Sequence, residues 1–509
     1  MSVLELRGTS DLVQLPLKRK GPMIEKMTAN NEPPRALRSL AQIIENDLCH
    51  RCGSCIGICP TGVLGVDSEE FPVVKNLSAC TDCDLCVKVC PGDEFNVPQF
   101  TEELYPEKPD IKDVYGSFIN GYLSHSTDPV IREKSTSGGF VSALLMSLIE
   151  NGEIDGALVI AADPETKFKG IPKIARTKEE IFAATKSKYA IVPTNTALKE
   201  IREVPGRYAI VGLPCQIHGY HKAKELDKRI KERVVLTIGL LCHAAIEHDP
   251  LKLLFENLGD EKKEVERFIY RVEKHPGSSY AVMKDGRYVP VLFPKAKGYQ
   301  PTAIEMMNIL YRLYTPMRCM TCYDSMVEFA DIAVGDPWMP TPSSEIDFYK
   351  GFSYLITRSE RGEKMLHKAH QAGALNLLKL SRESAKTSNY AMGSEKRRRA
   401  FRLLETRKRQ GLPVPNYGFD IPKFPIKGNL KHFLETEINL ITHIFCFSKK
   451  YRDLVLKFWL SPVGYGILKV NNVRRHIRTI MRNRKAEKMR REGKLAGVIE
   501  MKREEVQQW

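Results

Sequence analysis

Residues 49–60 read Cys49-His-Arg-Cys-Gly-Ser-Cys-Ile-Gly-Ile-Cys-Pro60, and this stretch sets the structure of the region around it. The same spacing, C-x2-C-x2-C-x3-C-P, returns in residues 80–91, which read Cys80-Thr-Asp-Cys-Asp-Leu-Cys-Val-Lys-Val-Cys-Pro91. Two-residue spacers let three thiolates of one loop bind three irons of a cube, while the fourth cysteine reaches the other cluster. The sequence therefore predicts two [4Fe-4S] clusters, one held by Cys49, Cys52, Cys55 and Cys90 and the other by Cys80, Cys83, Cys86 and Cys59.

Structural zinc is the alternative for these eight cysteines, because paired C-x2-C knuckles also supply four thiolates. Two copies of the four-cysteine spacing, each closed by proline, favour iron–sulfur clusters and a ferredoxin-type module. Such a module passes single electrons in sequence but has no substrate of its own. The chemistry that supplies or removes electrons is therefore expected elsewhere in the chain or on a partner.

Length, cysteine content and charge describe the rest of the chain in outline. With 509 residues the chain has room for two to four domains. It contains neither an N-terminal secretory pattern nor an apolar run long enough to span a membrane, so a cytoplasmic protein is expected, in which 13 cysteines indicate metal ligands. Residues 401–509 carry +14 of the net charge of +16, which is a poor profile for a nucleic-acid-binding core.

Composition divides the chain into four segments. Residues 1–40 are a polar extension, residues 41–100 the ferredoxin domain, residues 115–380 an α/β domain and residues 381–509 a basic, mostly helical extension. In the α/β domain, helical spacing over residues 140–149 is broken by Asn151-Gly152. Buried strands are expected at residues 157–162, 208–211, 234–241 and 331–334. Cys446 lies among apolar neighbours and is expected in a core.

Four more cysteines fall in the α/β domain. Cys215 and Cys242 each follow an expected strand, and Cys319 and Cys322 form a C-x2-C pair. Ligands of open parallel sheets bind beyond the carboxyl ends of strands, so two of these thiols should meet there. Spacing alone leaves open a third [4Fe-4S] cluster, a zinc site, or ordinary buried cysteines at 215 and 242.

A glycine-rich turn, Ser135-Thr-Ser-Gly-Gly-Phe140, precedes the helix of residues 140–149. Backbone N–H groups at such a helix start favour a phosphate, although plain N-capping is an equal alternative. Lys186-Ser-Lys-Tyr189 can add charge and hydroxyls, or form a solvated turn. Asp336, in Gly335-Asp-Pro-Trp338, places a carboxylate just past a strand, where it can accept a hydrogen bond from a ribose or ribityl hydroxyl.

Together these stretches resemble the family of beta subunits of coenzyme F420-reducing hydrogenases and dehydrogenases. The resemblance covers about residues 41–380, includes the fused ferredoxin module of some members, and does not extend to the tail. It is carried by several motifs in the same order, namely Ser135–Phe140, Glu150–Ala157, Ser187-Lys-Tyr189, Gly212-Leu-Pro-Cys-Gln216, Cys242-His243, Cys319-Met-Thr-Cys322, Ala330–Trp338 and Gly351–Asn376.

The resemblance implies a flavoprotein. Family members bind FAD and pass a hydride between it and the diffusible substrate coenzyme F420, while some reduce other molecules, as in hydroxymethyl chlorophyll reductases, or feed sulfite-reducing or glutamate-synthesising modules. Carried over, the FAD candidates are Ser137, Gly138, Gly139, Ser187, Lys188 and Asp336, and the ligands of a third cluster are Cys215, Cys242, Cys319 and Cys322. His218 and His243 are either proton-handling groups or, more simply, packed histidines.

Three functions follow from these expectations. The first is oxidation of reduced coenzyme F420 with electron delivery to a partner of hydrogenase, dehydrogenase or disulfide reductase type. The second uses the same flavin scaffold on another organic substrate, and the third is a non-catalytic electron relay. The basic tail, including residues 396–399 and 474–491, is expected to be a solvated helical face. The alternative is a docking arm for an acidic partner or a membrane surface, and binding of nucleic acid ranks third.

Overall fold

The computed structural model describes residues 33–105, 110–272, 277–343, 345–423, 449–492 and 498–501. Most of the N-terminal extension, part of the C-terminal extension and Cys446 lie outside these ranges.

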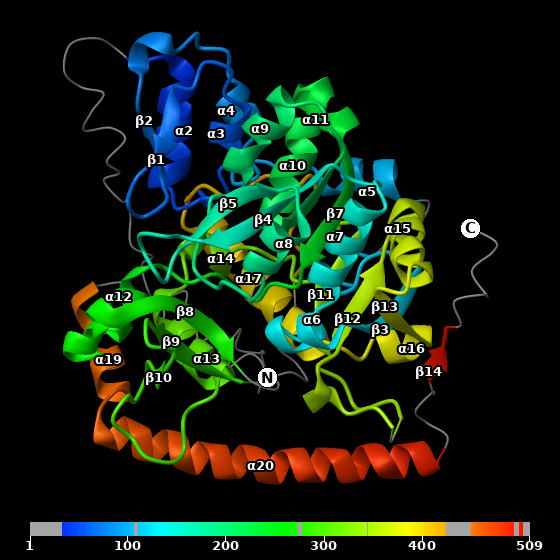
Figure 1. The fold of residues 1–509 in the computed structure, drawn as a ribbon. Coiled ribbons are helices and arrows are strands. Elements are labelled where there is room, and N and C mark those ends of the chain that lie inside the picture. Colours follow the sequence, from blue (N-terminus) through cyan, green and yellow to red (C-terminus); the bar gives the residue numbers. More distant parts are fainter. Residues whose placement is uncertain are drawn as a thin grey trace, which may run out of the picture.

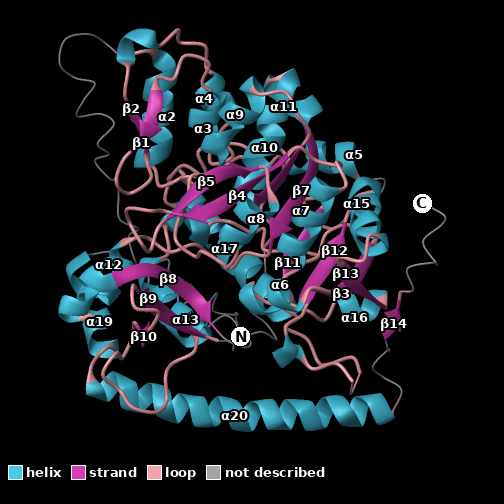
Figure 2. Cartoon of the chain, in the orientation of Figure 1, coloured by secondary structure: helices cyan, strands magenta, loops and turns pink. Residues whose placement is uncertain are grey.

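A nine-stranded sheet forms the centre of the molecule (Figures 1 and 2). In spatial order its strands are β14 (Val498–Glu500), β13 (Leu375–Leu380), β3 (Asn120–Ser126), β12 (Ser353–Thr357), β11 (Ile332–Gly335), β7 (Val234–Leu240), β6 (Tyr208–Gly212), β4 (Gly156–Ala162) and β5 (Gly170–Ala175). The neighbours β4, β6, β7 and β11 are parallel, and the remaining pairs are antiparallel. The α/β prediction is confirmed, and the four expected strands coincide with β4, β6, β7 and β11.

Helices cover both faces of this sheet. Residues that alternate along the central strands are therefore buried on opposite sides. In β4, Ala157 and Val159 belong to one core and Leu158 to the other. The first core is covered by α6 (Pro129–Lys134), α7 (Phe140–Glu150), α8 (Lys178–Ala183) and α15 (Glu360–Gln371). The second is covered by α9 (Leu198–Glu203), α10 (Pro214–Leu226), α11 (Lys228–Arg233), α16 (Arg382–Ala385) and α17 (Tyr390–Arg409).

The N-terminal cysteine motifs lie in a small module on the second face. Its elements are α2 (Arg35–Glu45), α3 (Ser54–Ile58), β1 (Leu64–Val66), β2 (Pro72–Val74), η2 (Leu77–Ala79), α4 (Leu85–Lys88) and α5 (Val97–Leu104). On α2, Leu37, Leu40 and Ile44 share one helical face and are buried. These residues belong to the same core cluster as Leu198 and Ile217 of α9 and α10, so the module is continuous with the main core.

Two glycines allow the module to approach the α/β domain closely. A Cβ atom on Gly57 of α3 would lie 2.0 Å from the carbonyl oxygen of Asn195, in η3 (Thr194–Ala197), and a Cβ on Gly219 of α10 would lie 2.1 Å from Ser54 Oγ. The side chain of Asn195 donates to Ser54 Oγ at 2.9 Å, and its backbone N–H donates to the Cys52 carbonyl at 2.9 Å. Backbone therefore packs directly on backbone beside the first cysteine motif.

A smaller lobe is built on a three-stranded antiparallel sheet of β8 (Val265–Val272), β9 (Ser278–Met283) and β10 (Tyr288–Pro290). Its helices are α12 (Asp249–Glu256), η4 (Gly259–Glu264) and α13 (Ala303–Tyr314). The short helix α14 (Met317–Met320) packs on α17, and η5 (Phe348–Lys350) follows β11. From the C-terminal region, α19 (Lys449–Trp459) and α20 (Pro462–Arg491) contribute Leu456 and Leu468 to the core of this lobe. The chain then returns to the large sheet as β14.

One part of the basic tail differs from the expectation of a solvated face. In α17, Lys396, Arg397 and Arg399 are buried, with exposed fractions of 1%, 2% and 4%. The cost of burying these cations is offset because their charged groups contact buried partners, for example Glu328 in the case of Arg397. Among the described residues, no helix is both long and apolar enough to cross a membrane.

Candidate functional site

The predicted site residues of the α/β domain gather at one edge of the large sheet. Because β3 runs in the same direction as β11, the carboxyl ends of β3, β4, β6, β7 and β11 lie at this edge. Cys215 follows β6, Cys242 follows β7, and the turn of residues 135–139 follows β3 and α6. The Cys319–Cys322 pair reaches the same edge, since the Cys242 N–H donates to the Ser325 carbonyl at 3.0 Å.

The cysteines predicted to hold the first cluster lie together in a buried position; they are Cys49, Cys52, Cys55 and Cys90. Burial raises the pKa of the Cys55 thiol well above its usual value, and the nearby thiols of Cys49, Cys90 and Cys52 raise it further. The same causes raise the pKa of Cys49 to about 12. Thiols in this environment stay protonated without metal, so cluster insertion would release protons.

The second predicted set also comes together, but nearer the surface. Burial raises the pKa of Cys86 to about 12, with contributions from the charges of Cys59, Cys83 and Cys80. At Cys59, burial opposes the thiolate, but backbone N–H donors of residues 61–63 outweigh it and lower the pKa. Cys83 is exposed, so this set reaches solvent.

The third set is assembled from distant parts of the chain. Burial raises the pKa of Cys215 well above its usual value, and the next causes are the charges of Cys52, Cys319, Cys322 and Cys242. Burial likewise raises the pKa of Cys242 to about 12. All four cysteines line one small cavity of about 30 Å³ together with Lys396.

A buried lysine belongs to this third set. Lys396 Nζ donates to the carbonyls of Cys242 at 2.8 Å and Asp324 at 2.6 Å. Burial by itself would lower the pKa of Lys396, but the acidic groups of Cys322, Cys242 and Asp324 raise it above its usual value. A lysine whose charged form is favoured by its surroundings therefore lies beside the four thiols.

Within the described ranges, no three His, Cys, Asp or Glu side chains are arranged to hold a single metal ion. A [4Fe-4S] cluster does not require that arrangement, because each of its four thiolate ligands binds a different iron.

The first cysteine set is the neighbour of both other sets. Cys86, of the second set, is among the charges that raise the pKa of Cys55 in the first set. Cys52, of the first set, is the first of the charges that raise the pKa of Cys215 in the third set. The buried guanidinium of Arg318 supports the first set, since it donates to the Leu48 carbonyl at 3.1 Å and the Pro91 carbonyl at 3.4 Å.

Two connected cavities open beside the third set. The outer cavity has a volume of about 840 Å³ and the inner cavity about 280 Å³, and they share residues 135–137 and 185–188 and Arg271. The inner cavity is lined by apolar side chains such as Leu145, Val211 and Leu240 and reaches Cys242. These volumes are typical of sites for large organic ligands.

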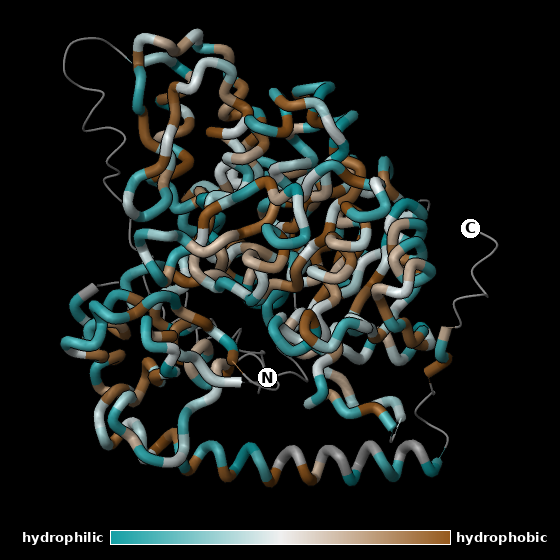
Figure 3. Tube along the Cα trace, viewed as in Figure 1, coloured by the Kyte–Doolittle hydropathy of each residue, from teal (hydrophilic) through white to brown (hydrophobic). Residues whose placement is uncertain are grey.

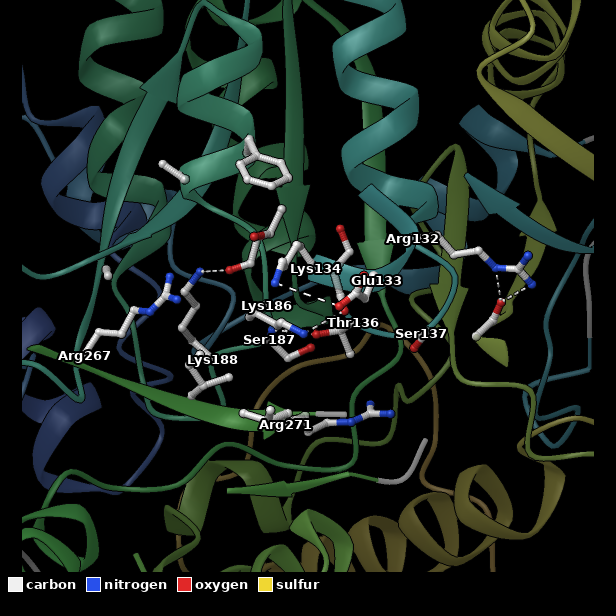
Figure 4. Close-up of a pocket in the computed structure, with 18 of the residues that line it drawn as sticks. Arg132, Glu133, Lys134, Thr136, Ser137, Lys186, Ser187, Lys188, Arg267 and Arg271 are labelled. Carbon is white, nitrogen blue, oxygen red and sulfur yellow. Dashed lines mark hydrogen bonds and ion pairs between the residues drawn. The ribbon is translucent and has the colours of Figure 1, made fainter. Parts of the chain in front are cut away.

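The outer cavity is strongly cationic (Figure 4). The cations in its lining are Arg132, Lys134, Lys186, Lys188, Arg267, Arg271 and Lys350, and Glu133 is the acidic residue among those described there. Burial, followed by the charges of Arg271, Lys134 and Arg267, lowers the pKa of Lys186 to about 8. Burial and Arg267 lower that of Lys188 to about 8. An anion bound here would relieve both effects, so the lining suits phosphate groups.

The turn of residues 135–139 is held in place by specific contacts. Ser137 and Gly139 have positive φ angles of 57° and 72°, and the Ser187 N–H donates to Thr136 Oγ1 at 3.0 Å. Ser137 Oγ donates to Asp336, which also accepts from Arg271 Nη1 at 2.8 Å. The predicted residues Ser137, Gly139, Ser187, Lys188 and Asp336 thus line the inner cavity.

Gly138 is placed differently from the other five FAD candidates. Its N–H donates to Ser353 Oγ at 3.2 Å, and its carbonyl accepts from the Ser126 N–H at 2.8 Å. A Cβ here would lie 2.6 Å from the Ser124 carbonyl oxygen. Gly138 therefore joins the turn to β3 and β12, and it is not part of either cavity lining.

The two histidines have different surroundings. His218 is buried, stacks on Phe95 with ring centroids 3.9 Å apart, and lies 3.2 Å from Asp324 Oδ2, so it is a packed histidine. His243 lines the inner cavity. Burial, then the charges of Arg399 and Lys396, hold its pKa well below the usual value, which leaves a neutral ring.

Some functional candidates were missed in the sequence. Arg267 and Arg271 stand four positions apart on β8, where such residues share a face, but their strand belongs to another lobe. Lys396 lies in the run Lys396-Arg-Arg-Arg399, which carries no signal for burial of one member.

Comparisons with known proteins agree with this architecture. Residues 122–199 match the family model described as coenzyme F420 hydrogenase/dehydrogenase, beta subunit N-term, and residues 206–383 match its C terminus. Together they cover about half of the chain. Residues 41–91 match a 4Fe-4S dicluster domain.

Several curated proteins are similar over much of the chain. Coenzyme F420-dependent sulfite reductase of Methanocaldococcus jannaschii is 26% identical over 70% of this chain, which spans 52% of that relative. A subunit of the F(420)H(2) dehydrogenase of Methanosarcina mazei is 27% identical over 65% of this chain and 84% of the relative. The beta subunit of the coenzyme F420 hydrogenase of Methanothermobacter thermautotrophicus is 26% identical over 59% of this chain and 99% of the relative.

A solved chain of the F420-reducing [NiFe] hydrogenase complex from Methanosarcina barkeri aligns at 23% identity with a TM-score of 0.46, over 61% of this chain and 98% of its own. From the two matched family models, the chain belongs to the family of coenzyme F420 hydrogenase/dehydrogenase beta subunits, with a 4Fe-4S dicluster domain ahead of the family core.

Proposed function

We propose that this chain is an iron–sulfur flavoprotein oxidoreductase that oxidises reduced coenzyme F420 through FAD and delivers the electrons through three [4Fe-4S] clusters to a partner. The observation that carries the proposal is the unbroken order of sites, from the cationic outer cavity through the inner cavity to the three cysteine sets and the surface. The relatives named for coenzyme F420 support the choice of substrate.

The residues present fit FAD. The cationic lining of the outer cavity suits a diphosphate, and the apolar inner cavity suits a flat ring system close to Cys242. When bound, a flavin exchanges two electrons with an organic substrate and one at a time with iron–sulfur clusters. Lys186, Lys188 and Arg271 are the residues that would bind the diphosphate, and Asp336 would accept a hydrogen bond from a sugar or ribityl hydroxyl.

Side chains of the inner cavity have supporting roles. Leu145, Val211 and Leu240 exclude water from the region next to the third set. The neutral ring of His243 is held by Tyr311, with centroids 5.6 Å apart, and by Arg399 Nη1 at 3.4 Å from Nε2. It can exchange a hydrogen bond with a bound ligand without adding charge.

The second cysteine set is the point at which electrons would leave or enter. Cys83 is exposed, whereas Cys52, Cys55 and Cys90 of the first set are buried. A redox partner protein of the hydrogenase, dehydrogenase or disulfide reductase type would therefore bind over residues 80–86. Two relatives are named as subunits, which supports a partner.

Anaerobic purification of the full chain provides the test. We expect about twelve irons per chain, four for each cube, and release of FAD on denaturation. Addition of reduced coenzyme F420 without oxygen should then bleach the flavin absorbance and reduce the clusters.

Two other results would change the assignment. Flavin that is reduced by dithionite but not by reduced coenzyme F420 would indicate another organic substrate on the same scaffold. Clusters without flavin would indicate an electron relay.

A further inference from the structure

Helix α20 is a 30-residue helix along the outer edge of the molecule (Figure 1). At 1.5 Å per residue it is about 45 Å long. One face of its first half packs on the smaller lobe. Leu468 is buried there, the ring of Tyr465 packs edge-on against Phe293 with centroids 4.8 Å apart, and Arg475 pairs with Glu305 at 2.9 Å.

The opposite face of α20 carries five exposed apolar side chains between residues 463 and 481. Val463, Val470 and Ile477 recur every seven residues, and Val473 and Met481 lie beside them. Their exposed fractions are 62%, 56%, 52%, 57% and 65%, respectively. Val470 and Ile477 lie about 180° around the helix from Leu468. We call these five residues the outer stripe, and Figure 3 shows hydrophobic and hydrophilic positions alternating along the helix.

Positive charge surrounds the outer stripe. Residues 462–491 contain ten Lys or Arg residues and one acidic residue, Glu487. Lys469, Arg474, Arg484 and Lys488 are among the exposed ones. The preceding helix α19 adds the exposed apolar side chains Tyr451, Leu454 and Phe458. Long basic side chains beside an apolar stripe can extend to anionic groups while their stems cover apolar surface.

We propose that the outer stripe of α20 binds an anionic membrane surface, with the helix lying in the plane of the interface. The stripe would enter the headgroup region, and the flanking cations would contact lipid phosphates. A straight helix at the outer edge lets every stripe residue meet a flat surface at once. A second copy of this chain fits less well, because two helices with the same positive charge would face each other.

The test uses the anaerobically purified full chain and sedimentation with lipid vesicles. The protein should bind vesicles of phosphatidylcholine mixed with phosphatidylglycerol, bind pure phosphatidylcholine weakly, and lose affinity as salt is added. The variant Val470→Asp with Ile477→Asp places two carboxylates in the stripe. The control Asn471→Asp with His476→Asp places two carboxylates at exposed positions of the same helix outside the stripe.

The stripe variant should bind at least about 100-fold more weakly than the control, because the two variants have the same added negative charge and differ in apolar contact. Unchanged iron content and circular dichroism would show that both variants fold. Equal binding of the two variants, or no binding of the unaltered protein to anionic vesicles, would overturn the proposal. A dimer, or a co-purified protein, lost only in the stripe variant without vesicle binding would overturn it in favour of a protein contact.

Discussion

The N-terminal module and the third cysteine set hold thiols in different ways. The module gathers eight cysteines within residues 49–90, on short loops and one-turn helices. The third set draws its cysteines from residues 215 to 322 and positions them after the carboxyl ends of β6 and β7, within α14 and just after α14. The first arrangement is local, and the second exists because a parallel sheet aligns distant strands.

The two regions also differ in the regular structure that supports the cysteines. The thiols of the module have little regular structure around them, so metal binding and folding should be coupled there. The third set is built on strands whose residues, such as Ile210 and Ile238, are fully buried. The scaffold of the third set should therefore persist when its cluster is lost.

Loss of one thiolate from each region should have the largest effect. Cys242→Ala should lower the iron content from about twelve to about eight per chain and abolish cluster reduction by reduced coenzyme F420. Its limited-proteolysis pattern should stay unchanged, because the sheet remains. Cys55→Ala should in addition make the segment around residues 41–105 protease-sensitive, and equal sensitivity in both variants would contradict the comparison.

Lys396→Met should change the reduction potential of the third cluster and leave those of the other two clusters unchanged. A positive charge stabilises the reduced, more negative cluster, so its removal should lower that cluster's potential, by on the order of 100 mV for one charge about 5 Å away at an effective dielectric constant of about 20. Redox titration followed by electron paramagnetic resonance measures this. Lys396→Arg should largely restore the potential, and equal shifts of all clusters would refute a local role.

Lys188→Met should weaken FAD retention by roughly 10- to 100-fold, the worth of one charge-assisted hydrogen bond. Titration of the flavin-depleted protein with FAD gives the dissociation constant. Lys350→Met is the matched control, because Lys350 is an exposed cation of the same outer cavity. A similar loss in both variants would indicate general electrostatic attraction.

Gly57→Ala tests the contact between the N-terminal module and the α/β domain that holds the third cysteine set. The added Cβ would meet the Asn195 carbonyl oxygen, and overpacking of this kind costs about 1–3 kcal/mol. The thermal midpoint should fall, and the magnetic coupling between the first and third clusters should weaken. Gly466→Ala on α20, with nothing within 4 Å of its Cβ, should not destabilise the protein and serves as the control.

The most gradual expected effect is that of pH on FAD binding. Lys186 and Lys188 have pKa values of about 8 in the cofactor-free protein, lowered by burial and by Arg271, Lys134 and Arg267. As the pH rises through about 8 the site loses positive charge, so affinity should fall by up to about tenfold per pH unit for each lysine. The cofactor-free protein should instead gain stability over this range, because its buried lysines become neutral. An affinity that rises with pH would contradict the first statement, and a cofactor-free protein that loses stability over this range would contradict the second.

Much of the site was predictable, for identifiable reasons. The spacing of residues 49–60 and 80–91 groups eight cysteines into two sets without any knowledge of tertiary structure. Strand patterns placed Cys215 and Cys242 at strand ends, and the sheet confirms both positions. By contrast, Lys396 and Arg318 are buried cations that look like surface residues in the sequence.

The sequence by itself determined the two local cysteine motifs, the α/β character and the glycine-rich turn of residues 135–139, because each depends on patterns within short stretches of chain. Only the tertiary structure decided the order of the three cysteine sets, the cationic cavity shared with β8, and the burial of Lys396. These depend on contacts between residues far apart in the chain, and local propensity carries no information about such contacts.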